Sequence, residues 1–444
     1  MASTRLEKTF TASNRKTFTI STWVKRGAIT VNNTIYGAGT SDSTDRDYLV
    51  FLQDSGEEDK LYFNAKVSNS TVAQFYSNRR FRDPSAWYHI VLAFDTTQST
   101  DTNRMKLYVN GELQTFQSVT YPNQNRDMNT NNTVHKIGST VGNGQYFNGL
   151  MSYFAFVDGT QYDPSYFGET DSSSGIWKIK TAPSVTYGTN GFFLKMDTSS
   201  PGTDTSGNSN TFTASGTPTL TQDNASNNFI TLNSLNAYYT NSTFSNGNTT
   251  FASGSSYSGT TANILLDTGK WYWEVKVISK DGDTDNYSIG IQGQEATGTN
   301  QYVGGQLFGY QYYGTSGQLY NNNSAASYGN TYTAGDIIGV ALDCTNNKLY
   351  FSKNGTFQNS GNPSTGSNGL SITAPASVTL GGYYPSQTFW SGSSGTFSMN
   401  FGNGFFGTTA VASSNADAAG HGLFEYTVPT GFYTLNTKNL NTYG

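Results

Sequence analysis

The chain has 444 residues, a length that suits two or three ordinary domains, each long enough to bury its own core. Charged residues make up 12% of the chain, against roughly 25% in a typical soluble domain, the net charge is −5, and no basic run occurs. A nucleic-acid-binding protein needs a cationic surface, so we exclude that class. The 30 tyrosines and 28 phenylalanines exclude a disordered chain.

Residues that favour strands and turns dominate the composition. Aromatic residues and Thr suit the pleated surface of a strand, whereas the 48 glycines, together with Asn and Ser, suit turns. Good helix formers are scarce, so the composition predicts an all-β chain of many short strands joined by tight turns. A single cysteine, Cys344, excludes an internal disulfide framework.

The start of the chain and its hydropathy bear on where the protein is made. Residues 1–10 lack the apolar run of a signal peptide, and no stretch approaches the roughly 18 consecutive apolar residues of a membrane helix. We therefore expect a chain that is made and folded in a cytoplasm and does not insert into a membrane.

The first 160 residues show the alternation of apolar and polar positions that is typical of half-buried strands. The expected strands are 17–24, 48–52, 61–65, 87–94, 105–109, 113–116 and 149–157. Asn110 and Gly111 predict a two-residue hairpin turn before the strand at 113–116, because both turn positions favour a positive φ. We place the first domain at residues 1–165.

A linking segment at residues 166–235 is poorer in strand patterns. Ser, Gly, Thr and Asn dominate residues 198–216, which suits either a linker or a strand-plus-loop extension of the first sandwich. The expected strand at 192–196 is strongly apolar and favours the extension.

A second β region follows at residues 236–425, and a C-terminal tail occupies residues 426–444. The expected strands are 271–277, 287–291, 307–310, 336–343, 348–352, 376–380 and 396–401. Asn354 and Gly355 predict another two-residue hairpin turn. No short-period repeat of a solenoid or propeller is present.

Four ordered motifs connect the first region with a known family. They are Phe18–Val24, Trp87–Asp95, Leu107–Leu113 and Phe147–Met151. In order and spacing they resemble a laminin-G-like jelly roll of the concanavalin A type. The resemblance covers about residues 1–160 and implies an antiparallel β-sandwich.

Five ordered motifs do the same for the second region. They are Gly269–Val275, Ser288–Ile291, Gly335–Asp343, Leu349–Gly355 and Asn400–Phe405. They resemble the strands of a SPRY domain. We therefore expect an all-β fold of two tandem antiparallel β-sandwiches, a laminin-G/concanavalin-A-like jelly roll followed by a SPRY-like sandwich.

Two further stretches resemble parts of tailed-phage virion proteins: a junction over 204–208 and 223–233, and a C-terminal end over 429–437. With the lectin-like jelly roll and the SPRY domain, this resemblance implies a bacteriophage structural protein on the virion surface, a tail fibre or appendage for host attachment. Its partners would be other virion proteins and a host-surface glycan, and we expect a homo-oligomer, with a trimer for a fibre. The alternatives are a capsid decoration protein and a polysaccharide depolymerase.

A depolymerase of the glycoside hydrolase type needs two carboxylates, roughly 5–10 Å apart, on either side of the bond. Glu274 stands alone in its strand, with Lys276 and Ile278 at the positions where an acidic partner would be needed. No other expected strand carries an acidic pair, and the three histidines are far apart. We therefore expect no enzyme and name no catalytic residue.

Two acidic stretches raise the question of a calcium ion, a cation that prefers several oxygen ligands. Asp54, Glu57, Glu58 and Asp59 form the first, and the laminin-G resemblance implies that such domains often hold this ion. We favour a solvated loop between two strands. Residues 281–286 alternate carboxylates but lack a Glu at the twelfth position, so a polar turn is favoured there as well. We expect no metal site and no cofactor.

Aromatic residues are concentrated in two parts of the second region, where SPRY domains carry their binding loops. Tyr and Trp give a large contact area with a polar tip, so these residues are the candidate binding site. Packing in the core is the alternative of equal weight. The candidates are Tyr310, Tyr312, Tyr313, Tyr383, Tyr384, Phe389 and Trp390.

Overall fold

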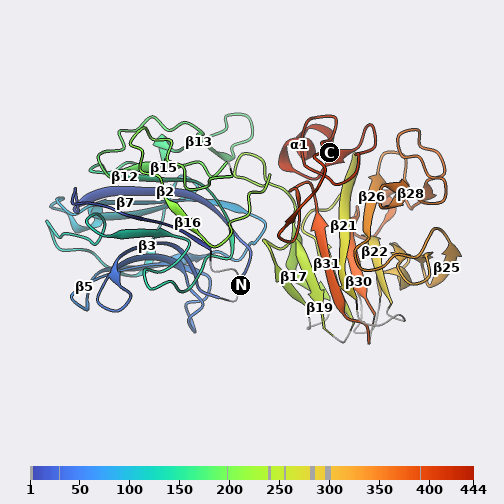
Figure 1. The fold of residues 1–444 in the computed structure, drawn as a ribbon, viewed down its shortest axis with the longest axis horizontal. Coiled ribbons are helices and arrows are strands. Elements are labelled where there is room, and N and C mark those ends of the chain that lie inside the picture. Colours follow the sequence, from blue (N-terminus) through green and yellow to red (C-terminus); the bar gives the residue numbers. More distant parts are fainter. Residues whose placement is uncertain are drawn as a thin grey trace. The chain divides into compact units, whose positions relative to one another are not determined.

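A computed structural model describes residues 4–29, 31–197, 199–238, 242–254, 257–280, 286–295, 302–390 and 392–444, without the side chains of 236–238. The chain divides into two compact units, one of residues 1–220 and 224–226 and one of residues 221–223 and 227–444. Each unit consists of two stacked β-sheets (Figure 1). In the described part of the chain no helix has the length and hydropathy needed to cross a membrane.

The first unit contains an eight-stranded and a six-stranded antiparallel sheet. The first sheet is, in spatial order, β10 (Phe116–Thr120), β6 (Ser70–Arg80), β5 (Lys60–Val67), β4 (Asp45–Phe51), β3 (Asn33–Ser41), β11 (Val134–Ile137), β1 (Arg5–Thr9) and β16 (Thr213–Ser215). The second is β15 (Phe192–Leu194), β12 (Gly149–Asp158), β2 (Thr17–Arg26), β7 (Trp87–Asp95), β8 (Met105–Val109) and β9 (Glu112–Leu113). A separate hairpin, β13 (Gly168–Thr170) and β14 (Trp177–Ile179), and the short 3₁₀ turns η1 (Asp101–Asn103) and η2 (Pro164–Tyr166) complete it.

Almost every residue of β2 is buried, because apolar clusters cover both faces of its sheet. Phe18, Ile20 and Val24 enter the core between the two sheets. On the opposite face of the same sheet, a smaller apolar cluster forms under the segment that follows β12. Its buried members are Val91, Ala155, Val157, Phe167 and Phe193. The segment after residue 165 therefore belongs to the first unit, where β15 pairs with β12.

The hairpin turn at Asn110 and Gly111 is confirmed, with φ values of 49° and 84°. The expected return strand at 113–116 is only partly correct. Glu112–Leu113 returns alongside β8, whereas β10 begins at Phe116 and pairs with β6 in the other sheet.

The second unit also has two sheets. The seven-stranded sheet is β17 (Leu232–Tyr238), β20 (Ser258–Ala262), β30 (Tyr384–Phe389), β22 (Tyr287–Gln292), β23 (Gly309–Tyr313), β24 (Gln318–Asn321) and β25 (Ser324–Ser327). The nine-stranded sheet is β18 (Thr243–Ser245), β19 (Thr250–Ser253), β31 (Gly395–Asn400), β21 (Lys270–Lys280), β26 (Ile337–Asp343), β27 (Lys348–Lys353) and β28 (Thr356–Phe357), with β29 (Leu370–Ser371) on β27 and β34 (Tyr433–Thr434) on β21. The remaining elements are β32 (Phe405–Phe406), β33 (Thr409–Ala410), the 3₁₀ turns η3 (Val303–Gly305) and η4 (Pro375–Ser377), and α1 (Thr437–Tyr443).

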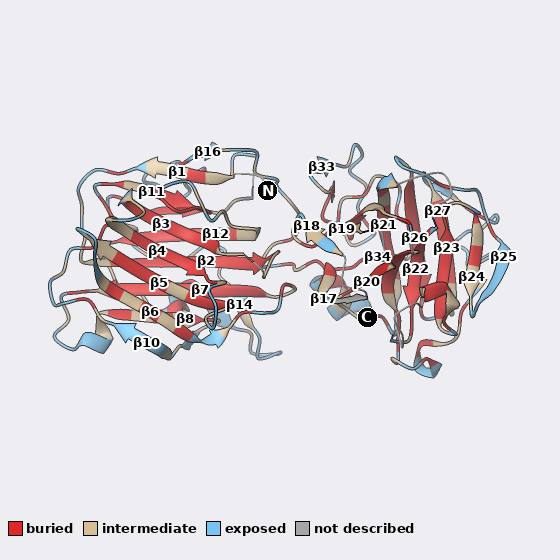
Figure 2. Ribbon diagram, turned by 90° about the horizontal axis from the view of Figure 1, so that it is seen from below, coloured by how far each residue is buried: buried red, intermediate tan, exposed pale blue. Residues whose placement is uncertain are grey.

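Alternation along β21 gives this unit two apolar layers. Trp271, Trp273 and Val275 lie in the main core between the sheets. Tyr272 faces the other way and packs with Phe424 and its neighbours in a second cluster formed by the C-terminal part of the chain. Figure 2 shows the strand centres of both units buried and the outermost strands exposed.

The strand expected at 376–380 is wrong. Pro375 begins the 3₁₀ turn η4 there, and the Val378 N–H closes that turn on the Pro375 carbonyl, so the backbone is turned where an extended strand was expected. The strand of this region is β30, at Tyr384–Phe389. The short strands β24 and β25 were not expected, and neither was α1.

Replacement of Ile289 by Ala tests the separation of the two cores. Ile289 is fully buried in the second core, so Ile289→Ala is expected to destabilise the second unit by about 2–5 kcal/mol. We expect two urea unfolding transitions, of which only one moves. Leu307→Ala is the control, because Leu307 is 52% exposed. An equal shift of both transitions would contradict two separate cores.

Candidate binding site

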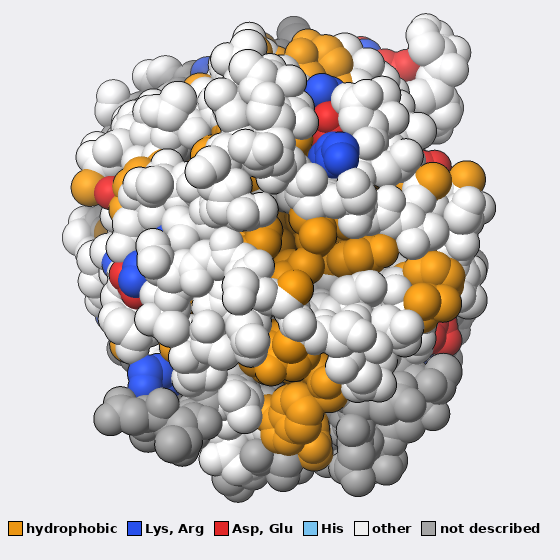
Figure 3. Space-filling view, turned by 90° about the vertical axis from the view of Figure 1, so that its right-hand side faces the viewer, with side chains coloured by type: hydrophobic (Ala, Val, Ile, Leu, Met, Phe, Trp, Pro, Cys, Tyr) orange, Lys and Arg blue, Asp and Glu red, His pale blue; other side chains and the backbone are white. Residues whose placement is uncertain are grey.

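The seven strands β17, β20, β30, β22, β23, β24 and β25 contain no charged residue. The opposite sheet does carry charges, among them Lys270, Glu274 and Lys353. The sequence from Asn354 to Ala416 is also free of Asp, Glu, Lys, Arg and His. Figure 3, which faces the β25 end of the second unit, shows a mostly uncharged surface with a band of hydrophobic side chains.

Five aromatic rings lie together at this uncharged sheet, and we call them the aromatic cluster: Tyr257, Tyr302, Tyr313, Tyr320 and Trp390. The ring centroids of Tyr302 and Trp390 are 4.2 Å apart, and those of Tyr313 and Tyr320 are 4.1 Å apart. Tyr302 also lies edge-on to Tyr313, at 6.1 Å, and Tyr257 lies 5.6 Å from Trp390. Tyr313 is buried and the other four rings are half-buried.

Strand alternation positions part of the cluster. Along β23, Tyr312 points into the core and the next residue, Tyr313, points to the outer face of the sheet. Tyr320 is on the same outer face, because it pairs with Gln311, two residues before Tyr313. Trp390 follows directly after β30.

A loop supplies the remaining contact. Tyr302 precedes η3, and its hydroxyl donates to the Asn323 side chain over 3.0 Å. A Cβ atom at Gly305 would lie 3.2 Å from the Tyr302 ring, so glycine lets the loop pass close beneath it.

Two phenols of the cluster, those of Tyr302 and Tyr313, stay neutral in water near pH 7. Burial is the main cause that raises the pKa values of Tyr302 and Tyr313, and neighbouring tyrosines raise them further. The cluster therefore offers ring faces and hydroxyl groups without any charge.

The structure separates the seven candidate residues named from the sequence. Tyr310, Tyr312, Tyr383 and Phe389 lie in the core, where the alternative interpretation placed them. Tyr384 is half-buried at the start of β30. Tyr313 and Trp390 belong to the aromatic cluster. Their role in binding stays a prediction.

Sequence reasoning missed Tyr257, Tyr302 and Tyr320. Tyr320 could have been predicted from the sequence. A strand that follows β23 and pairs with it, as β24 does, places Tyr320 on the same face as Tyr313. Tyr302 and Tyr257 come from segments without a strand pattern, and only the folded chain brings them to this sheet.

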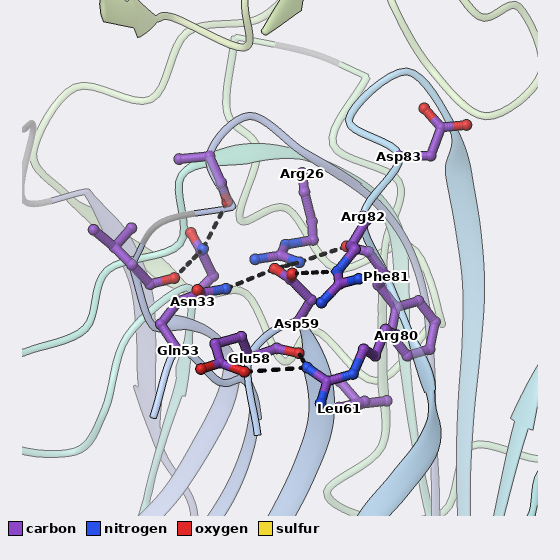
Figure 4. Close-up of polar contacts among 12 residues, drawn as sticks. Arg26, Asn33, Gln53, Glu58, Asp59, Leu61, Arg80, Phe81, Arg82 and Asp83 are labelled. Carbon is purple, nitrogen blue, oxygen red and sulfur yellow. Dashed lines mark hydrogen bonds and ion pairs between the residues drawn. The ribbon is translucent and has the colours of Figure 1, made fainter. Parts of the chain in front are cut away.

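In the first unit, Glu58 and Asp59 of the acidic stretch at 54–59 form ion pairs with arginine side chains (Figure 4). Asp59 lies 3.0 Å from Arg26 and 3.0 Å from Arg82, and it also accepts from the Gln53 amide. Arg26 is fully buried, and desolvation lowers its pKa although Asp59 opposes that effect. Asp59 thus compensates a buried charge.

The neighbouring carboxylates have cations of their own. Glu57 pairs with Lys60 and Glu58 with Arg80. Within the described ranges, no three His, Cys, Asp or Glu side chains gather as metal ligands would. The second acidic stretch, 281–285, lies outside the described residues. The expectation of no metal therefore stays a prediction.

His89 is the histidine that most resembles a catalytic group, because its Nε2 lies 2.8 Å from the Ser21 hydroxyl oxygen. The indole N–H of Trp177 donates to its Nδ1 over 3.0 Å, so Nε2 carries the proton and donates to Ser21. A general base needs the reverse arrangement. Burial also lowers the pKa of His89 to about 3. Ser21 and Trp23 line a cavity of about 10 Å³, which has room for one water.

Glu274 is fully buried and binds the backbone of the C-terminal part of the chain. Its carboxylate accepts from the backbone N–H groups of Glu425 and Tyr426 over 2.9 and 2.8 Å. The Tyr272 hydroxyl and the Asn400 amide donate to it as well. Desolvation raises its pKa to about 7. Glu274 therefore holds the C-terminal part of the chain on β21.

Comparison with known proteins agrees with the fold. The molecule is a protein of two antiparallel β-sandwiches, and each sandwich matches a known domain. Residues 3–161 match the concanavalin A-like lectin/glucanases superfamily, and residues 270–403 match the SPRY domain. The chain thus contains both domains, as the sequence motifs predict.

Several curated proteins are similar to part of this chain. Ran-binding protein 9 of Danio rerio is 35% identical over 88 residues, which are 20% of this chain and 14% of that protein. Ran-binding protein 9 of Homo sapiens is 34% identical over 88 residues, which are 20% of this chain and 12% of that protein. Among solved structures, the SPRY domain of human HERC1 has 18% identity and a TM-score of 0.28, covering 38% of this chain and 96% of that one.

The prediction of a bacteriophage virion surface protein is wrong. The matched curated proteins are cellular proteins of eukaryotes. That finding contradicts the tail-fibre, capsid-decoration and phage-depolymerase functions, the virion location, and the virion and host-glycan partners with their fibre trimer. The prediction rested on the resemblance of three short stretches, 204–208, 223–233 and 429–437. The error has a physical reason, since Gly, Asn, Ser and Thr in such stretches mark tight turns in proteins of any source.

Asp59→Asn tests the buried ion pair. The variant keeps the shape of the side chain but leaves the Arg26 charge uncompensated, which is expected to destabilise the first unit by about 3 kcal/mol in urea unfolding. Glu58→Gln is the matched control, because its pair with Arg80 is 40% and 31% exposed. Equal effects of the two variants would show that Asp59 does not support Arg26.

Glu274→Gln tests how the contribution of Glu274 to the stability of the second unit depends on pH. The folded-state pKa of about 7 exceeds the ordinary value of 4.5, so this contribution to stability is present below pH 4.5 and is lost as the pH rises to about 7. The loss amounts to about 3 kcal/mol. The variant cannot ionise, and its second unit should lose this pH dependence. The first unit is the internal reference. Burial raises the pKa of its Asp47 to about 7, so the first unit should keep its own pH dependence in both proteins. Identical pH profiles of the second unit in both proteins would refute the assignment.

Proposed function

We propose that the chain is a non-catalytic binding protein whose SPRY unit holds an uncharged segment of a partner protein on the aromatic cluster. The observation that supports this most is the gathering of five aromatic rings, four of them half-buried, on a sheet without charged residues. Rings of this kind give a large contact area at a small cost in side-chain entropy. A charged partner would find no counter-charge on these strands.

Two further observations favour binding over catalysis. In His89 the nitrogen that faces Ser21 carries the proton, so it cannot accept one as a general base. The Glu274 carboxylate accepts hydrogen bonds from two backbone N–H groups. The matched relatives are named for binding Ran, so they favour a protein partner. The aligned segment is a small part of their length, and Ran is therefore only the first whole protein to assay.

A peptide array tests the proposal. The full chain is incubated with dodecapeptides in uncharged, acidic and basic sets of otherwise equal composition, and binding of the selected peptides is then measured in solution. We expect binders in the uncharged set. Trp390→Ala and Tyr302→Ala should each weaken binding at least tenfold, about 1.4 kcal/mol.

Tyr166→Ala is the control, because Tyr166 is 41% exposed in the first unit, outside the cluster. It should bind the peptides as the wild type does. Thermal unfolding of each variant confirms that the sandwich is intact. Binders from the charged sets, or an unchanged affinity in both cluster variants, would reject the proposal.

A further inference from the structure

The uncharged sheet ends at a strand that has an open side. β25 pairs with β24, and no other described strand is its neighbour. All four of its residues are exposed, and Figure 2 shows it in the colour of exposed residues. Soluble proteins usually protect such an edge by keeping it very short, or with Lys, Pro, a bulge or a covering segment. The sequence of β25 is Ser-Ala-Ala-Ser and contains none of these residues.

The turn before β25 fixes which backbone groups point outward. Asn322 and Asn323 have φ values of 50° and 58°, as a type I′ hairpin turn requires. The N–H of Ser324 therefore points back to Asn321 on β24. Because the direction alternates along an antiparallel pair, Ala326 also bonds to β24, whereas Ala325 and Ser327 direct their N–H and C=O groups away from the sheet.

The side chains place this edge beside the aromatic cluster. Ala325 pairs with Tyr320 and shares its face, the outer face of the sheet. Ala325 ends in a methyl group, so it leaves the space above itself open toward the Tyr320 ring. An added strand would run about 4.8 Å from β25 and roughly 10 Å from β24. A long side chain of that strand can lean across Ala325 and meet Tyr320.

We propose that β25 takes up the partner segment as an additional β-strand, with alternate side chains of the segment directed onto the aromatic cluster. This inference rests on the proposed function and specifies its geometry. Backbone bonds to Ala325 and Ser327 supply affinity that does not depend on sequence, and the pockets for alternate side chains supply selectivity.

The segment of another protein fits this edge better than a second copy of β25. In two copies paired through Ala325 and Ser327, the side chains that each strand offers the other are methyl and hydroxyl groups, too short to reach Tyr320. A segment with apolar or aromatic residues at alternate positions uses both the edge and the rings. Lys or Glu at those positions would lie next to strands without a counter-charge.

Backbone methylation of a peptide selected on the array gives the direct test. In an added strand only every second N–H faces β25, so N-methyl groups at alternate positions should weaken binding at least tenfold, and those between them should have little effect. Binding to the full chain is measured in solution for each methylated peptide. A loss without this period of two, or no loss at all, would overturn strand addition.

A pair of variants tests the same edge from the side of the protein. Ala325→Pro removes one outward N–H and places its ring where the added strand would lie, while the bonds of Ser324 and Ala326 to β24 stay. Ala325→Ser keeps the N–H and a small side chain. We expect at least a tenfold loss for the first variant and wild-type affinity for the second. If Trp390→Ala loses the peptide but Ala325→Pro retains it, the aromatic cluster binds without strand addition. A dimer in sedimentation that the peptide cannot dissociate would assign the edge to a second copy.

Discussion

Alternation of side chains along a strand is the constraint on which the second unit depends. Because successive residues face opposite sides of a sheet, neighbouring tyrosines on β23 have different tasks. Tyr312 fills the core, and Tyr313 anchors the ring cluster outside it. β21 uses the same rule, with Trp273 facing inward and Glu274 facing the C-terminal part of the chain. One strand pattern thus builds a core and a second layer at once.

The sequence is most informative where strands are long and their apolar residues regular. The patterns around Thr17, Trp87, Trp271 and Ile337 predict β2, β7, β21 and β26 to within a few residues. Short strands carry too little pattern: Ser-Ala-Ala-Ser has no β-branched or aromatic residue, yet its place after a type I′ turn makes it β25. Ala376–Leu380 has the right residue types but follows Pro375, which begins a 3₁₀ turn.

The candidate site shows a different limit. Alternation tells that Tyr312 and Tyr313 face opposite sides but not which side is the core. That choice depends on the partner sheet, and so the seven aromatic candidates mixed core residues with surface residues. Tyr302 reaches the cluster through a loop and Trp390 through the end of β30, contacts that no local pattern encodes. Domain motifs, by contrast, depend on several strands in order and identified both sandwiches.

The charge-free strands also bear on how the proposed partner segment would arrive. They carry no charge that could steer it, and two neutral surfaces meet at roughly 10⁵–10⁶ M⁻¹ s⁻¹. Ionic strength, which screens charged interfaces, has little to act on here. The proposed binding would therefore proceed at a similar rate in dilute and in salty solution, and differences in occupancy would come from how long the partner segment stays bound.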